Sequence, residues 1–124
     1  MAKWANDLVM DAAFDYIDQC DKMFVCSAQP ATYAEASATY DLATATMTAD
    51  TDYTKADAAG GGRQVTVAAK SAVTIDHSGT ATYIALGKSS DTSLRYVTTC
   101  TSQALVAAGT VDIPAWIITI GDPT

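Results

Sequence analysis

Three cysteines, one histidine and a group of aspartates carry the reactive or metal-binding side chains of this chain. A zinc site would have to combine the single histidine with the thiols, which are Cys20, Cys26 and Cys100, with His77 as the fourth ligand. The spacing Cys-x5-Cys is poor for structural zinc, which favours about two to four intervening residues. We therefore expect no metal here and interpret the cysteines as free, buried thiols. A Cys20–Cys26 disulfide is the alternative.

The tripeptide Asp76-His77-Ser78 contains the three residue types of a hydrolytic triad. Neighbours in the chain cannot fold onto one another so that the acid orients the base and the base reaches the nucleophile. Followed by Gly79, the segment is typical of a turn. Because no other stretch resembles an active site, we predict that the protein is not an enzyme and needs no cofactor.

Asp50, Asp52 and Asp57 resemble the start of a calcium-binding loop. The EF-hand pattern then requires glycine at its sixth position and glutamate at its twelfth, where this chain has Lys55 and Gly61. We expect a solvated loop at these residues. A weak cation site is the alternative.

The net charge of −7 restricts the class of partner. Binding to nucleic acid needs concentrated positive charge, and so does binding to an anionic membrane surface. Neither is expected for this chain. Only 17% of the residues are charged, against about 25% in typical domains, which leaves much surface free for contact with other proteins.

The chain of 124 residues is long enough to bury a core without a metal or a disulfide, and we predict one domain over 1–124. The first residues, MAKWANDLVMDAAFDYI, lack the unbroken apolar run of a signal peptide, and no later stretch is long enough to span a bilayer. We therefore expect the chain to fold in a cytosol, where cysteines stay reduced.

Residues 3–19 are predicted to form a helix with an acidic stripe opposite an apolar face. The stripe consists of Asp7, Asp11, Asp15 and Asp18, and the apolar face of Val9, Ala13, Tyr16, Ile17 and Cys20. We expect the stripe to be solvated, with a docking surface for a basic partner as the alternative. Trp4 and Leu8 lie beside the acids, where they either cover the edge of the domain or anchor a neighbouring protein.

The remainder, 23–124, has the pattern of a β-sandwich. Residues 23–27 are predicted to form a buried strand, and the segment from Tyr33 a short helical turn followed by a strand. Residues 48–62 are polar and acidic and end in three glycines, which predicts a flexible loop.

From residue 63 onward the apolar and polar residues nearly alternate. The alternation covers 63–75, continues in a hairpin of 79–87 and 94–100, and reappears over 110–120. Its phase changes at Pro114, so the chain must bulge or change sheets there. The sequence predicts a mainly β fold: an antiparallel β-sandwich, jelly-roll or Ig-like, with one N-terminal α-helix.

Five stretches together resemble a family of small structural proteins from the virions of tailed bacteriophages: CSAQPATYAEA (26–36), GRQVTVAAKSAVTI (62–75), GTATYIALG (79–87), LRYVTTC (94–100) and VDIPAWIITIGDP (111–123). The resemblance extends over nearly the whole chain and is carried by turns and alternating strands. It implies a virion component assembled in the host cytoplasm. It identifies no catalytic residues in this chain.

On this basis we expect a capsid decoration or cement protein that binds the major capsid protein and self-associates as a dimer or trimer. The expected contact residues are Trp4 and Leu8, together with Asp50, Asp52 and Asp57. A tail or head–tail junction protein of the same fold is the first alternative. The second is a carbohydrate- or receptor-binding module that uses exposed aromatic residues such as Tyr53, Tyr83 or Trp116.

Overall fold

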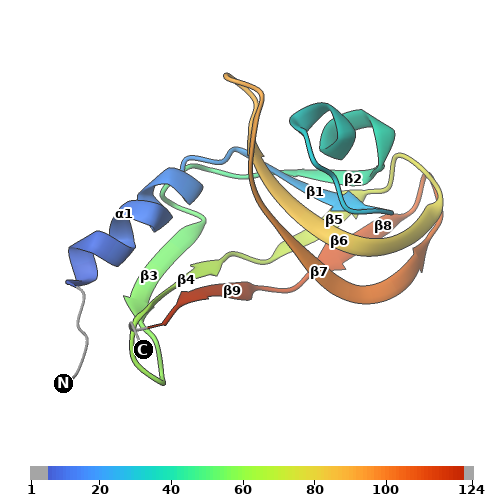
Figure 1. The fold of residues 1–124 in the computed structure, drawn as a ribbon. Coiled ribbons are helices and arrows are strands. Elements are labelled where there is room, and N and C mark those ends of the chain that lie inside the picture. Colours follow the sequence, from blue (N-terminus) through green and yellow to red (C-terminus); the bar gives the residue numbers. More distant parts are fainter. Residues whose placement is uncertain (1–5, 122–124) are drawn as a thin grey trace.

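The computed structural model describes residues 6–121 and confirms the predicted class: a mainly β, sandwich-like fold of antiparallel sheets with one N-terminal helix (Figure 1). The elements are α1 (Asp7–Ile17), β1 (Lys22–Cys26), the π-helical turn η1 (Glu35–Thr39), β2 (Asp41–Thr46), β3 (Tyr53–Asp57), β4 (Arg63–Val67), β5 (Lys70–Thr74), β6 (Gly79–Lys88), β7 (Ser93–Leu105), β8 (Thr110–Ile113) and β9 (Trp116–Ile120).

One layer is a four-stranded antiparallel sheet in the order β2-β1-β6-β7. The other is a long ribbon, in which the sheet β3-β4-β9 is followed by the pair β5-β8 (Figure 1). The β5–β8 pair continues the register of the β4–β9 pair: Val67 lies opposite Trp116, and Lys70 lies opposite Ile113. Residues 68–69 and 114–115, between these two pairs, belong to no strand. We predicted that the chain bulges or changes sheets at Pro114. This is confirmed, because β8 and β9, on either side of Pro114, belong to different sheets.

The core lies between the two layers and is made mostly of aliphatic and sulfur-containing side chains, with Phe14 and Tyr53 as aromatic members. Among the fully buried ones are Phe14, Met23, Leu86, Val65, Val67 and Cys20. The predicted buried strand at 23–27 and the helical turn before β2 are confirmed as β1 and η1. The predicted hairpin is also confirmed, because β6 and β7 pair along their lengths.

The expected core face of the helix was only partly right, because Ile17 packs against the core and Cys20 is buried in it, but the other three residues are not. Met10 and Phe14 are the buried residues of α1, whereas Val9 and Tyr16 are 66% and 54% exposed and Ala13 is exposed as well. The helix is rotated because its acids turn toward basic side chains of β3 and β4, which the helical period alone does not reveal. No helix in the described part of the chain is long and apolar enough to cross a membrane.

The helix also begins later and ends earlier than the predicted 3–19. Asn6 is its N-cap, and the Asn6 Oδ1 accepts a hydrogen bond of 2.8 Å from the backbone N–H of Leu8. At the other end the N–H of Asp18 donates to the carbonyl of Phe14, and the chain then leaves the helix. Residues 3–5 lie outside the described residues.

The segment 48–62 is not the single flexible loop that was predicted, because it contains β3. Tyr53 begins this strand, is 5% exposed, and donates its hydroxyl to the carbonyl of Cys20 at 2.9 Å. Gly62 has a φ of +86°, and a Cβ there would lie 2.1 Å from the carbonyl oxygen of Ile120. The glycines thus form a tight β3–β4 turn packed on the end of β9.

Candidate functional site

The residues considered for nucleophilic chemistry are used to hold a turn. His77 is exposed, and its Nδ1 lies 2.9 Å from the carbonyl oxygen of Asp41. The hydroxyl of Ser78 accepts a hydrogen bond of 2.9 Å from the N–H of Ala107. The turn predicted at 76–79 is a bend at His77 in the connection between β5 and β6, which begins at Gly79, and the two side chains contact different segments of backbone.

All three cysteines are free. Cys20 and Cys26 are fully buried, as expected, whereas Cys100 is only partly buried. Burial raises the pKa of the Cys20 thiol to about 11 and that of Cys26 to about 12. Both thiols are therefore protonated at neutral pH and are poor nucleophiles. Among residues 6–121, no three His, Cys, Asp or Glu side chains are grouped closely enough to hold a metal ion.

The three aspartates of the suspected calcium loop do not share a common ligand site, because each has different surroundings. Asp52 accepts from the N–H of Thr48 and forms an ion pair of 2.9 Å with Lys70. Burial raises its pKa, but these two hydrogen bonds outweigh burial and hold that pKa below the ordinary value. Asp57 pairs with Arg63 at the far end of β3, and Asp50 is exposed with a φ of 64°. Two of the three carboxylates are thus engaged within the chain.

The expectation of a solvated acidic stripe is corrected in part: Asp7 and Asp15 are exposed, whereas Asp11 is half-buried and Asp18 buried against the β-ribbon. The guanidinium of Arg63 binds both carboxylate oxygens of Asp11, at 2.9 and 3.2 Å. The ammonium of Lys55 contacts Asp15 and lies 3.1 Å from the Oδ2 of Asp18. These pairs dock α1 on β3 and β4.

A third basic residue, Arg95 on β7, holds the C-terminal end of α1. Its side chain is 4% exposed and donates to the carbonyl of Tyr16 at 2.7 Å and to the amide oxygen of Gln19 at 3.0 Å. The guanidinium also lies 3.7 Å above the Tyr16 ring and pairs with Asp91. Sequence reasoning missed this residue, because an arginine in an alternating strand gives no sign of a helix 76 residues earlier in the chain.

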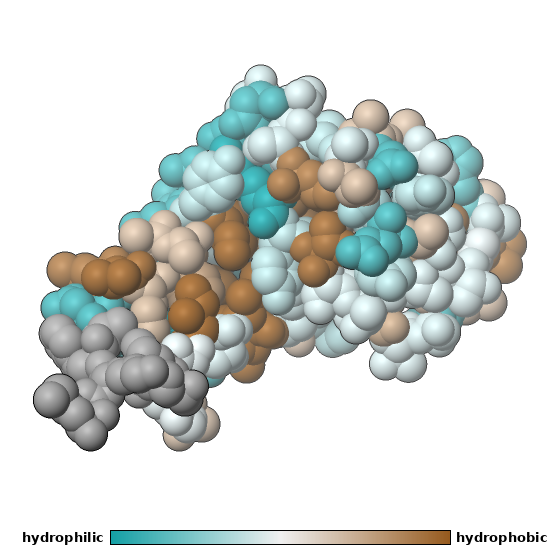
Figure 2. All heavy atoms as spheres, in the orientation of Figure 1, coloured by the Kyte–Doolittle hydropathy of each residue, from teal (hydrophilic) through white to brown (hydrophobic). Residues whose placement is uncertain are grey.

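On the side away from the ion pairs with Lys55 and Arg63, α1 presents an apolar surface to solvent. We call Leu8, Val9, Ala12, Ala13 and Tyr16 the outward face of α1; all are exposed, Leu8 by 76% and Val9 by 66%. Figure 2 shows hydrophobic atoms along this helix, next to the grey atoms. Of the expected contact residues, Leu8 belongs to this face, and Trp4 lies outside the described residues.

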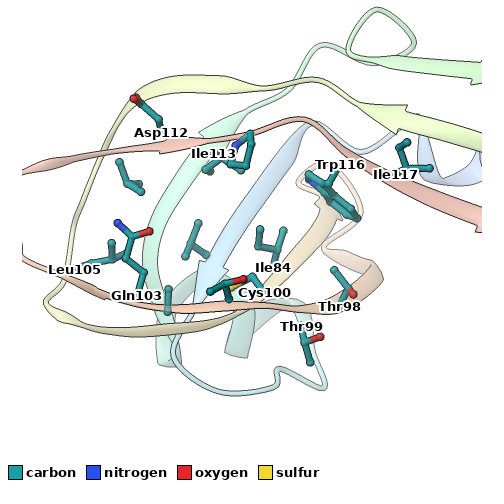
Figure 3. A pocket seen from close by; sticks show the side chains of 15 residues that line it. Ile84, Thr98, Thr99, Cys100, Gln103, Leu105, Asp112, Ile113, Trp116 and Ile117 are labelled. Carbon is teal, nitrogen blue, oxygen red and sulfur yellow. The ribbon is translucent and has the colours of Figure 1, made fainter.

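A concave surface lies between β7 and the β8–β9 segment. We call it the edge cleft; its volume is about 420 Å³. Its lining combines apolar and hydroxyl side chains: Val25, Ala81, Ile84, Thr98, Thr99, Cys100, Thr101, Gln103, Leu105, Val111, Asp112, Ile113, Pro114, Trp116 and Ile117 (Figure 3).

Trp116 forms one end of the edge cleft. Its ring stacks on Tyr96 with centroids 5.9 Å apart, and its Nε1 is buried without a hydrogen-bond partner. Asp112 already accepts a hydrogen bond of 2.8 Å from the N–H of Ala72. The aromatic residues named for a carbohydrate site are dispersed, because Tyr53 is buried in the core and Trp116 lies at this cleft.

The edge cleft has the composition of a binding surface. Apart from the carboxylate of Asp112, the only ionisable group lining it is the Cys100 thiol, whose pKa is raised by burial. Such a surface can cover apolar groups and exchange hydrogen bonds with a partner, but it offers no poised acid and base. Comparison with known proteins found no matching family model, no matching curated protein and no matching solved structure.

Proposed function

We infer that this protein is a non-enzymatic structural component of a bacteriophage virion, and that it decorates the capsid by binding the lattice of the major capsid protein. The observation that carries the proposal is the outward face of α1. A solvated helix normally turns its charges to water, whereas α1 pairs Asp11, Asp15 and its C-cap Asp18 with basic residues of the β-ribbon and leaves apolar residues outside.

The rest of the described surface supports a contact role. Lys55, Arg63 and Arg95 are all engaged in positioning α1, so these three residues are not free to bind nucleic acid. A weak apolar contact of this size becomes effective when it is repeated around a lattice, because the avidity of many copies replaces the affinity of one. The resemblance to small virion proteins of tailed phages agrees with this reading.

The test is a count of copies in purified particles of the phage that encodes the chain, by quantitative mass spectrometry. Hundreds of copies per particle are expected for a capsid decoration protein. A few dozen or fewer would assign the same fold to the tail or to the head–tail junction. Absence from the particle would contradict both assignments.

A further inference from the structure

The sandwich is open on the side of the edge cleft. β7 is the last strand of its sheet, and β8 and β9 each pair with one strand only. No backbone hydrogen bond joins β7 to β8 or β9 within the described residues. Figure 3 shows the two strand segments on opposite sides of the cleft. This side therefore presents two unpaired strand edges with an apolar space between them.

The edge of β7 lacks charge and proline as protection against pairing and carries one bulge. Natural sheets protect their edges with lysine, proline or inward-pointing charges. Residues 96–105, YVTTCTSQAL, contain no charged residue and no proline. Opposite Thr82 a bulge places three residues of β7, and two of these, Cys100 and Thr101, line the cleft. Apart from this bulge, nothing in the segment opposes the addition of a strand.

The charge distribution favours a second copy of this chain as the occupant. Residues 93–121 contain only two charged side chains, Arg95 and Asp112, which have opposite signs. The excess negative charge of the chain thus lies elsewhere, and two copies can approach through this side without bringing like charges together. Hydroxyl side chains at Thr99, Thr101 and Ser102 are self-complementary, because each can both donate and accept across a strand pair.

We propose that two copies associate about a two-fold axis through their open sides, with the β7 edges antiparallel. The four-stranded sheet then continues from one copy into the other. Each copy covers the edge cleft of its partner, which removes the 53% exposed Ile117 from water and brings polar groups within reach of the unpartnered Trp116 Nε1. This inference uses none of the residues on the outward face of α1, so it stands or fails independently of the virion assignment.

The first test is sedimentation velocity on the wild-type chain and on a Thr99→Lys/Thr101→Lys double variant. The wild type is expected to dimerise, and the double variant to weaken the dimer by about tenfold or more, because two lysines then lie on the paired edge. Added lysines make the chain less negative, so general charge repulsion cannot cause the loss. Thr46→Lys, on the opposite edge of the same sheet, and Val9→Lys are the matched controls and should remain dimeric. A monomeric wild type, or a dimer that the double variant leaves intact, would overturn the proposal.

The second test needs no destabilising substitution. In a Cys100→Ser background, single cysteines are placed at Thr99, Thr101 or Gln103 and, as a control, at Thr46, and the protein is oxidised. At least one β7 position is expected to form a disulfide-linked dimer, and Thr46→Cys is expected to stay monomeric, while Cys20 and Cys26 remain protected in the core. Equal cross-linking at both edges, or none at β7, would contradict the two-fold pairing.

Discussion

The end of the molecule formed by α1, β3 and β4 and the open side formed by β7, β8 and β9 use charge in opposite ways. At the first, Arg63 and Lys55 bind four aspartates and fix the orientation of the helix. At the second, the cleft is lined by hydroxyl and apolar groups with a single carboxylate. The difference indicates that the ionisable residues of the first region hold the fold together, and it supports the proposal that contact with other proteins uses surfaces with few charges.

The largest expected effect is a difference in the free energy of unfolding between substitutions on the buried face and on the outward face of α1. Phe14→Ala removes a fully buried ring and should lower the free energy of unfolding by about 3–5 kcal/mol, measured by urea denaturation. Val9→Ala, on the outward face, should change it by less than about 0.5 kcal/mol. Similar losses for the two variants would show that the outward face is packed against something in the isolated protein.

A smaller loss is expected where the helix is joined to β7. Arg95→Met keeps the bulk of the buried side chain but removes its hydrogen bonds to Tyr16, Gln19 and Asp91, and should cost about 2–3 kcal/mol. Lys22→Met is the control, because the Lys22 ammonium donates only to the exposed Thr46 hydroxyl. A loss no greater than that of the control would mean that Arg95 does not position the helix.

The smallest effects are opposite pH dependences of stability at two aspartates, Asp18 at the end of α1 and Asp91 at the β6–β7 turn. Burial raises the pKa of Asp18 above 3.8, against the opposing hydrogen bond from Lys55, so its ionisation disfavours the fold as pH rises through that folded pKa. Asp18→Asn should therefore gain stability relative to wild type between acid and neutral pH.

Hydrogen bonds from Ser93, with a contribution from Arg95, lower the pKa of Asp91 at the β6–β7 turn below 3.8. Its stabilising contribution is present above 3.8 and is lost as pH falls through the folded pKa, so Asp91→Asn should lose stability relative to wild type toward neutral pH. Urea denaturation of both variants across acid to neutral pH measures the two trends. Parallel trends would contradict these assignments.

Local patterns were sufficient for most of the fold. The alternation in β6 and β7 and the change of sheets at Pro114 follow from neighbouring residues, and the structure confirms them. The strand β3 was missed because its polar sequence resembles a loop, and only the burial of Tyr53 and the ladder with β4 make it a strand.

The candidate surfaces could be predicted only in part. Leu8 was identified from its place beside the acids, but the exposure of Val9 and Tyr16 depends on the rotation of α1, which is set by Arg63 and Arg95 far along the chain. The edge cleft was not predicted, because it arises from strand edges that only the sheet order leaves unpaired. Both candidate surfaces are therefore determined by tertiary contacts: ion pairs set the outward face of α1, and the order of strands sets the edge cleft.

Co-sedimentation with purified particles tests most directly whether the outward face of α1 is the contact surface. Val9→Lys is compared with Val106→Lys, which alters another exposed valine, 70% exposed and far along the chain. Binding of Val9→Lys is expected to fall by about tenfold or more, since a desolvated apolar contact tolerates an added charge poorly, while Val106→Lys should bind like wild type. Equal binding by the two variants would contradict the account.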